Sequence, residues 1–354
     1  MASITKPFIP LVHLQQNELG LTIRDYEGEM STLCAGCGHD SITTAIVRSL
    51  FELAIPPHMI AKLSGIGCSS KTPTYFVRGA HGFNSVHGRM VTIATGANAA
   101  NRELQYIGIS GDGDSLSIGL GHLAHAIRRN VRMLYVIENN GVYGLTKGQF
   151  SASADINSKS KRGEPNMLAP IDPVLMALSL GATFVARGFS GDKEHLIPIL
   201  KAGLSHRGFA LIDVISPCVQ FNDHEGSTKS YQFTRQHEVR ATDFVPPHDE
   251  ILATVPDDGA ISVTMHSGSV MRFRCVPEGY DPTDRMSVAS YLEERHAKGE
   301  VVTGLLYANE DVPDVHELNR TPDEPLVSIP YDKLCPGSDE LAKLQELSFR
   351  ASRI

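Results

Sequence analysis

The sequence predicts an α/β fold, in which a mostly parallel sheet has helices on both faces and an irregular C-terminal extension follows. Two observations support this prediction. Strand-like and helix-like segments alternate from residue 34 to about residue 240, and glycine-containing turns follow several of the apolar strands. Such alternation is typical of βαβ units with a covered parallel sheet. Because ligands in these folds bind beyond the carboxyl ends of the strands, the turns after the strands are where we expect a site.

Each element follows from the spacing of its apolar residues. Apolar runs predict strands at residues 58–65, 105–114, 131–140, 183–186 and 209–215. Apolar residues at helical spacing predict helices at residues 41–54, 89–104, 115–130, 173–180 and 193–206.

The chain divides into three predicted parts. Residues 1–30 lack periodicity and form an N-terminal arm, residues 31–240 form the main domain, and residues 241–354 form an acidic extension. Residues 1–240 carry 22 basic and 19 acidic residues, whereas residues 241–354 carry 10 and 21. Short helices are expected at residues 287–298 and 338–350. We expect the extension to pack on the domain or on a partner subunit.

Composition excludes several classes of protein. Apolar residues make up 42% of the 354 residues, charged residues make up 20%, and the net charge is −8. An ordinary folded protein is expected, with no nucleic-acid partner, since no basic excess exists. No apolar run approaches the roughly 18 residues that span a membrane, and no signal peptide is visible, so a cytoplasmic location is expected. Six cysteines are too few for a disulfide scaffold, and Cys275 and Cys335 in the extension are expected to be ordinary thiols.

A glycine–aspartate turn is the first candidate site. GDGDS (residues 111–115) lies where a strand meets a helix, and its glycines let the backbone approach a phosphate. Asp112 repels a phosphate unless it binds a divalent cation that bridges to a diphosphate. Asn140 ends the next strand and can offer its amide oxygen, and the loop after it can offer a carbonyl. The alternatives are an exposed turn with a helix-capping Asp, or a dinucleotide site, although no G-x-G-x-x-G follows a strand here.

Four cysteines form the second candidate site. Cys34 and Cys37 form a C-x-x-C pair at a helix start, and Cys68 and Cys218 each follow a strand, so the four can converge. Four thiolates suit a tetrahedral zinc ion or a 4Fe–4S cluster. One close pair with two distant single cysteines favours the cluster, because structural zinc sites usually use two pairs. The C-x-x-C pair alone also fits a redox dithiol.

Six motifs occur in order: CAGCGH, SGIGCSSK, HGR, GDGD, ENNGVYGLTKGQ and SPC. Together they resemble the β subunit of 2-oxoacid:ferredoxin oxidoreductases, most closely the 2-oxoglutarate type, over about residues 25–240. Within them, GDG followed by NN is similar to the thiamine diphosphate signature. The resemblance implies a thiamine diphosphate-binding and iron–sulfur domain at residues 31–240. It also implies an α subunit that completes the active site, in an (αβ)2 assembly.

The resemblance implies a reaction as well. Oxidative decarboxylation of 2-oxoglutarate with coenzyme A gives succinyl-CoA and CO2, electrons pass through one 4Fe–4S cluster to ferredoxin, and the reaction is reversible. The alternatives are the same chemistry on pyruvate or on a broad range of 2-oxoacids, or a non-redox thiamine-dependent decarboxylase or synthase. That last alternative leaves the four cysteines without a role. A zinc-stabilised binding subunit would leave GDG and the paired asparagines without one.

The resemblance also assigns residues. The cluster ligands are Cys34, Cys37, Cys68 and Cys218, and magnesium is bound by Asp112, Asn140 and the carbonyl of Val142. Thiamine diphosphate is expected beside Gly67, Ser69, His87, Gly88, Arg89, Gly111, Gly113, Asp114 and Thr146. The substrate is expected to face Lys71, Leu145 and Lys147, where the two lysines suit a dicarboxylate. His87 and Arg89 fit a structural loop equally well, and His39, His122 and His125 are expected to be packing or surface residues.

Overall fold

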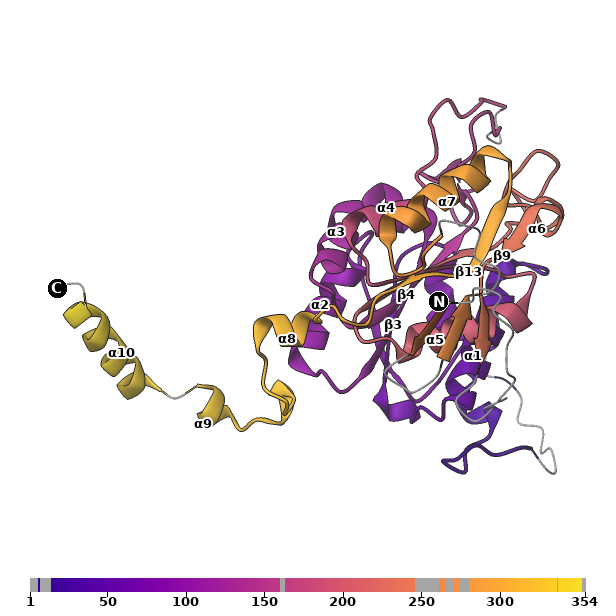
Figure 1. The fold of residues 1–354 in the computed structure, drawn as a ribbon. Helices are drawn as coiled ribbons and strands as arrows, with labels where there is room; N and C mark the ends of the chain where they lie inside the picture. Colours follow the sequence, from indigo (N-terminus) through magenta and orange to yellow (C-terminus); the bar gives the residue numbers. More distant parts are fainter. Residues whose placement is uncertain are drawn as a thin grey trace.

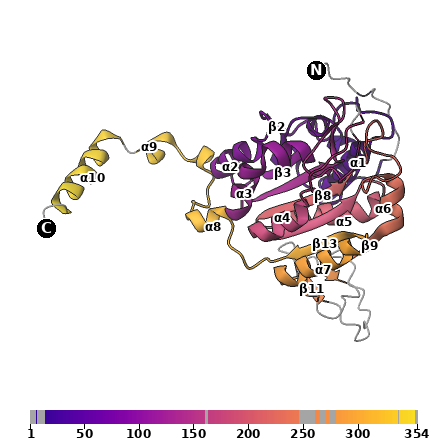
Figure 2. The ribbon, with the colours of Figure 1, turned by 90° about the horizontal axis from the view of Figure 1, so that it is seen from above.

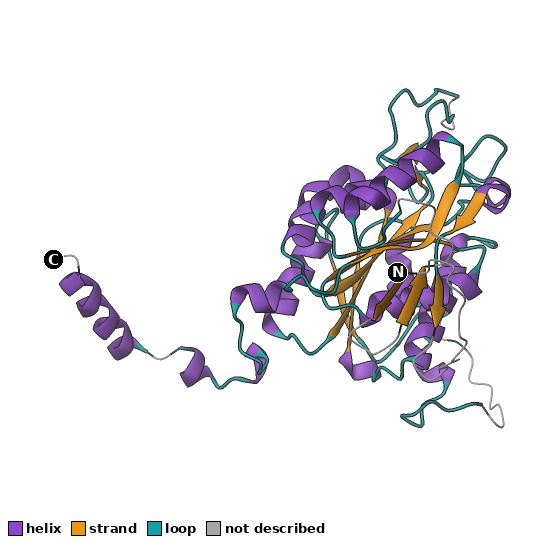
Figure 3. Cartoon of the chain, in the orientation of Figure 1, coloured by secondary structure: helices purple, strands orange, loops and turns teal. Residues whose placement is uncertain are grey.

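The computed structural model describes residues 6, 14–159, 163–245, 261–264, 270–273, 280–335 and 337–351. Within them, one eight-stranded sheet has the order β2-β1-β3-β4-β8-β7-β13-β9. Figure 3 shows this sheet between its helices. Its strands are β1 (Ile60–Ser64), β2 (His81–Asn84), β3 (Gln105–Gly111), β4 (Met133–Asn139), β7 (Phe184–Phe189), β8 (Phe209–Ile215), β9 (Glu238–Arg240) and β13 (Val301–Ala308).

Six neighbouring strands of the sheet, from β2 to β7, run parallel to one another. Strand β13 pairs antiparallel with β7, and β9 pairs parallel with β13. The mostly parallel, helix-covered sheet confirms the predicted fold class. Two small sheets consist of β5 (Val142–Tyr143) with β6 (Gln149–Phe150), and of β10 (Asp243–Val245), β11 (Ile261–Thr264) and β12 (Val270–Phe273).

Helices cover both faces of the sheet. The longer helices are α1 (Gly38–Glu52), α2 (Met90–Ala100), α3 (Leu120–Arg128), α4 (Pro173–Leu180), α5 (Lys193–Ser205), α7 (Arg285–Ala297) and α10 (Ser338–Ala351). The shorter ones are η1 (Ile23–Tyr26), η2 (Pro57–Met59), η3 (Ser69–Thr74), η4 (Gly113–Ile118), α6 (Tyr231–His237), α8 (Val315–Asn319), η5 (Leu326–Ser328) and α9 (Tyr331–Leu334).

The core has two layers, because side chains alternate across the central strands. Leu134 and Val136 of β4 pack with α1 and α5 on one face, whereas Tyr135 and Ile137 pack with α2, α3, α4 and α7 on the other. A strand buried on both faces is a continuous apolar run rather than an alternating one. This explains why the central strands were recognisable from the sequence.

The predicted elements differ from the structure mainly at their ends. Helix α4 and strand β8 have the predicted bounds, but α1 begins at Gly38 because Cys37 is its N-cap residue. The helix expected at residues 115–130 is two helices. Its first turn, η4, is a π-helix in which the Gly119 N–H donates to the Asp114 carbonyl at 2.8 Å. Single π-helical turns often occur at functional sites.

Sequence reasoning missed β13, although Val301–Ala308 is mostly apolar and only Thr303 and Gly304 interrupt it. Residues 302–308 are buried, so the region expected to be a surface extension also contributes a strand to the sheet. The predicted boundary at residue 240 remains a prediction.

Beyond β13, Asp314 accepts a hydrogen bond from Arg132 at 2.9 Å and holds α8 against the sheet domain. Helices α9 and α10 reach away from it (Figures 1 and 2).

Two further expectations concern the remaining chain. Within the described residues, no helix is long and apolar enough to cross a membrane. Cys335 is exposed, whereas Cys275 lies outside the described residues.

Candidate active site at the carboxyl edge of the sheet

Parallel strands bring distant motifs to one edge of the sheet. Cys68 follows β1, Asp112 follows β3, Asn140 follows β4 and Cys218 follows β8, each within four residues of the strand's carboxyl end. Because these four strands are parallel, their carboxyl ends lie on the same edge. The predicted metal-binding residues therefore come from sequence-distant turns that share one location.

Asp112 is a buried carboxylate held by three donors. Its side chain is 1% exposed. The Gly141 N–H donates to Oδ2 at 3.0 Å, the Ser153 hydroxyl donates to it at 2.6 Å, and the Ser151 hydroxyl also contacts it. Burial raises the pKa of Asp112, and these serines and the nearby Lys229 ammonium counteract that rise. A bound cation would compensate the desolvation of this carboxylate.

The loop after β4 has a fixed shape beside Asp112. The Val142 N–H donates to Oδ1 of Asn140 at 3.1 Å, and the Asn222 side chain donates to the Asn140 carbonyl at 2.8 Å. Gly141 between them has a φ of +75°, and a Cβ there would lie 2.7 Å from Asn222 Nδ2. Only glycine fits this turn, which brings Asn140 and Val142 to the cavity that Asp112 lines.

A cavity of about 140 Å³ opens at this edge. Twelve residues predicted from the sequence line it: Gly67, Cys68, Ser69, His87, Gly111, Asp112, Gly113, Asp114, Asn140, Val142, Leu145 and Thr146. Five unpredicted residues complete its wall: His39, Ile66, Glu138, Tyr143 and Gly144. Seven predicted residues do not line it: Cys34, Cys37, Lys71, Gly88, Arg89, Lys147 and Cys218.

Gly88 and Arg89 instead support the wall of the cavity. The Gly88 N–H donates to Asp114 Oδ1 at 2.8 Å, and Ser110 donates to Oδ2 at 2.9 Å. The Asp114 carboxylate thus joins the loop at Gly88 to the end of β3, which leaves only its backbone for a phosphate. Arg89 Nη1 lies 3.2 Å from Nδ1 of His122. His122 is therefore a contact of the HGR loop.

The residues expected to face the substrate lie at an open rim. The turn between β5 and β6 carries Leu145, which is 46% exposed, and Lys147, which is exposed and has a φ of +88°. Lys71, in η3, donates to the Thr32 carbonyl at 3.5 Å. The structure does not gather these three side chains around a closed pocket within the described residues.

The four predicted cluster cysteines are neighbours. A Cβ added to Gly144 would lie 3.5 Å from the Cys68 sulfur and 3.6 Å from the Cys218 sulfur. Burial raises the pKa of the Cys68 thiol, with contributions from Cys218 and Cys34, and burial raises that of Cys37 to about 12, with a contribution from Cys218. The four thiols thus lie close enough to influence one another electrostatically.

The four sulfur atoms are spaced more widely than the ligands of a structural zinc ion. Among the described residues, which include all four cysteines, no three of the sulfurs lie within 4.8 Å of one another. Zinc–sulfur bonds of about 2.3 Å in a tetrahedron would place them about 3.8 Å apart. The wider arrangement fits a larger centre such as an iron–sulfur cluster.

Sequence reasoning missed a buried pair in the cavity wall. Glu138 is 0% exposed and accepts a hydrogen bond from Thr72 at 2.9 Å, and burial raises its pKa well above the usual range. His39 Nδ1 lies 3.6 Å from Glu138 and 2.6 Å from the Ser216 hydroxyl. The signal in the sequence was a glutamate at the end of an apolar strand, directly before the two asparagines.

Comparison with known proteins agrees with this geometry. The family model described as "Thiamine pyrophosphate enzyme, C-terminal TPP binding domain" matches residues 65–214. A 2-oxoacid:ferredoxin oxidoreductase subunit β from Saccharolobus solfataricus is 42% identical over 212 residues, which cover 60% of this chain and 69% of that protein. The chain belongs to this family of β subunits.

Two further relatives of this β subunit are named for 2-oxoglutarate. The 2-oxoglutarate oxidoreductase subunit KorB of Mycobacterium tuberculosis is 42% identical over 191 residues, 54% of this chain and 51% of that protein. A solved 2-oxoglutarate:ferredoxin oxidoreductase from Magnetococcus marinus, with 2-oxoglutarate, coenzyme A and succinyl-CoA bound, aligns with a TM-score of 0.70 and 30% identity over 89% of this chain and 94% of that one.

These findings confirm the family, the fold class and the enzyme class predicted from the motifs. This β subunit has a thiamine diphosphate-binding domain, and its family name implies an α subunit as partner.

Proposed function

We propose that this β subunit, with its α subunit, catalyses the oxidative decarboxylation of 2-oxoglutarate with coenzyme A to succinyl-CoA and CO2. Electrons would pass through one 4Fe–4S cluster to ferredoxin, and the reaction would run in reverse when reduced ferredoxin is abundant. The observation that carries the proposal is a shared wall: Cys68 lines the same cavity as Asp112. The names of the relatives support 2-oxoglutarate and coenzyme A.

The cavity residues fit a magnesium ion with a diphosphate. Asp112, Asn140 and the Val142 carbonyl offer three oxygens, the ligand type that magnesium prefers. Gly113 lies at the cavity with no room for a side chain, since a Cβ there would lie 2.4 Å from the Tyr143 ring. The Tyr143 hydroxyl donates to the Gly113 carbonyl at 2.9 Å and fixes the turn.

We assign the other cofactor contacts in two groups. Gly67, Ser69, His87, Gly111, Gly113, Asp114 and Thr146 would contact thiamine diphosphate directly, with Asp114 acting through its backbone. Gly88 and Arg89 would act indirectly, because Gly88 holds the Asp114 carboxylate and Arg89 contacts His122. Thiamine diphosphate, when bound, supplies the electron sink for loss of CO2 from a 2-oxoacid.

The cysteines fit one iron–sulfur cluster beside that cofactor. Cys34 and Cys37 precede α1, Cys68 precedes η3, and Cys218 follows β8, so three elements would hold the four ligands. Burial raises the pKa of the Cys218 thiol, and the neighbouring backbone N–H groups of Gln220, Phe221 and Asn222 counteract that rise. Hydrogen bonds from backbone N–H groups stabilise a thiolate ligand.

Substrate choice is the finer part of the proposal. Lys71 and Lys147 are the two cationic residues expected to face the substrate, and a dicarboxylate needs such partners. Lys147 is exposed and Lys71 is half-buried, which leaves room for the α subunit to complete the pocket. We propose an (αβ)2 assembly for the same reason, since half of the site has no counterpart in the described residues. The alternative is the same chemistry on pyruvate or on many 2-oxoacids.

One experiment tests the proposed reaction. The reconstituted αβ enzyme should reduce ferredoxin with 2-oxoglutarate and coenzyme A faster than with pyruvate. Cys218→Ser should abolish ferredoxin reduction, while Cys335→Ser, at an exposed cysteine, should leave it unchanged. Release of CO2 without ferredoxin reduction by the unmodified enzyme would instead indicate a non-redox decarboxylase. Pyruvate as the better substrate would overturn the substrate assignment alone.

A further inference from the structure

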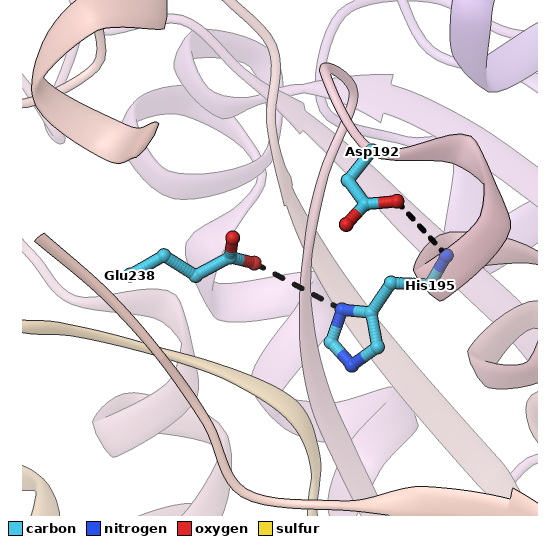
Figure 4. A group of neighbouring side chains, drawn as sticks. All are labelled: Asp192, His195 and Glu238. Atoms are coloured by element: carbon cyan, nitrogen blue, oxygen red, sulfur yellow. Dashed lines mark hydrogen bonds and ion pairs between the residues drawn. The ribbon is translucent and has the colours of Figure 1, made fainter. Parts of the chain in front are cut away.

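A second group of metal-ligating side chains lies apart from the active site. Asp192 is the N-cap residue of α5, His195 lies in the first turn of that helix, and Glu238 begins β9 (Figure 4). None of the three lines the cavity at Asp112. They also lie outside every motif that carried the family resemblance.

The three side chains point toward one another. One ring nitrogen of His195 and one carboxylate oxygen from each acid lie within 4.8 Å of one another. Nδ1 of His195 is 3.9 Å from Oε1 of Glu238, and both side chains are 12% exposed. The Asp192 carboxylate accepts a hydrogen bond from the His195 N–H at 3.1 Å, which fixes it at the start of α5.

A third element positions Glu238. Thr303 of β13 donates a hydrogen bond to Oε1 of Glu238 at 2.7 Å. Carboxylates that ligate metals are commonly oriented by such a second hydrogen bond. The group therefore joins α5 to β9 and β13, the last two strands at one end of the sheet.

We propose that Asp192, His195 and Glu238 bind a divalent transition-metal ion of the zinc class. One imidazole nitrogen and two carboxylate oxygens match a three-ligand zinc site with a fourth position for water, whereas magnesium and calcium prefer oxygen ligands alone. Bonds of about 2.0–2.2 Å require ligand atoms about 3.3–3.6 Å apart, so the side chains need to close by between a few tenths of an ångström and about 1.5 Å.

Arg240 sets the strength of this site. Its guanidinium contacts Asp192 Oδ2 and lies 3.9 Å from Glu238 Oε2, with the arginine side chain 55% exposed. One positive charge facing two carboxylates leaves a net charge of −1 for a metal to neutralise. Because Arg240 and the metal compete for the same carboxylates, removing Arg240 should strengthen metal binding.

The ion would be structural. It would fasten β9, at the end of the sheet, to α5, and so stabilise the place where the chain passes from the main domain into residues 241–354. Binding to the folded state alone raises the melting temperature. Activity should not depend on the ion, because the three ligands do not line the active-site cavity.

The test titrates zinc into the anaerobic αβ enzyme with its cluster, thiamine diphosphate and magnesium in place. The unmodified enzyme should bind one more zinc ion than His195→Gln, by mass spectrometry after dialysis, and should gain several degrees of melting temperature with zinc. His58→Gln, at an exposed histidine elsewhere, is the matched control and should behave as the unmodified enzyme. Arg240→Gln should bind the ion several-fold more tightly.

Two results would overturn the proposal. One is equal zinc binding by the unmodified enzyme and His195→Gln. The other is weaker binding by Arg240→Gln. If His195→Gln folds poorly, Glu238→Gln gives the same comparison, because it removes a ligand charge while keeping an acceptor for Thr303.

Discussion

The cavity has a cofactor side, at Asp112, and a substrate side, at the turn that carries Leu145 and Lys147. The two sides differ in burial and in hydrogen bonding. Asp112 is 1% exposed and accepts hydrogen bonds from two serines and a backbone N–H, whereas Leu145 is 46% exposed. Lys147 is exposed as well. The chain thus builds a tightly hydrogen-bonded site that would suit the proposed metal and diphosphate, and it leaves the proposed substrate rim open. In the proposed function, the α subunit would exclude water and complete that rim.

The largest loss of activity should come from a substitution on the cofactor side, at Asp112. Asp112→Asn removes the charge that would bind magnesium, so thiamine-dependent turnover should fall by about 100-fold or more. Asp323→Asn, in an exposed ion pair with Arg102, is the control and should keep full activity. Circular dichroism would show that both variants fold. Turnover of Asp112→Asn near that of the control would remove Asp112 from the metal site.

A smaller effect should come from a residue that positions Asp112. The Ser153 hydroxyl reaches both Asp112 Oδ2 at 2.6 Å and Asn139 Oδ1 at 2.8 Å. Ser153→Ala should weaken magnesium binding by about 10–100-fold, and saturating magnesium should restore most of kcat. Titration of activity with magnesium separates this from a loss of fold, which added magnesium would not repair.

Substitutions on the substrate side should change the substrate preference and leave cofactor binding unchanged. Lys71→Ala and Lys147→Ala should each raise KM for 2-oxoglutarate by about 10-fold, the loss of one charge-assisted hydrogen bond, with little effect on pyruvate. The affinity for thiamine diphosphate should stay unchanged. An equal rise of KM for both substrates would mean that the lysines do not read the second carboxylate.

The smallest effect should be a change in the unfolding free energy as the pH falls, caused by Asp155 near the cofactor side. Although burial alone would raise the pKa of Asp155, the Lys229 ammonium at 3.0 Å and Thr228 hold it below its ordinary value of 3.8. A depressed pKa stabilises the fold above the unfolded value, and this contribution is lost as the pH falls through the folded value. The unmodified protein should exceed Asp155→Asn in unfolding free energy by about 1 kcal/mol at neutral pH.

Chemical denaturation at a series of pH values would measure this difference. The gap between the two proteins should shrink from about pH 5 toward about pH 3. A gap that stays constant over that range would show that the Asp155 charge does not stabilise the fold.

The sequence predicted the cofactor side of the cavity better than the parts whose roles depend on packing. Apolar β3 and β4 and their following turns were recognisable, and parallel pairing then necessarily brought Asp112 and Asn140 together. Glu138 and His39 were missed because their roles come from burial against Thr72 and Ser216, which lie far away in sequence. Gly88 was expected at the cofactor, but it contacts the Asp114 side chain, a choice that only packing decides.

The C-terminal part shows the limit of local patterns. The run of residues 301–308 is as apolar as a central strand, but its proline- and glycine-broken surroundings favoured a surface extension. Its place between β7 and β9 depends on a long-range antiparallel pairing, which periodicity does not reveal.

The central claim is that this chain contributes a preformed cofactor half of a redox active site. Anaerobic absorption spectroscopy of the αβ enzyme tests it most directly. The unmodified enzyme should be brown, with the broad visible absorption of an iron–sulfur cluster, and should bleach on addition of 2-oxoglutarate and coenzyme A. Asp112→Asn should be equally brown and should not bleach. A colourless unmodified enzyme, or an Asp112→Asn variant that bleaches as fast, would contradict the account.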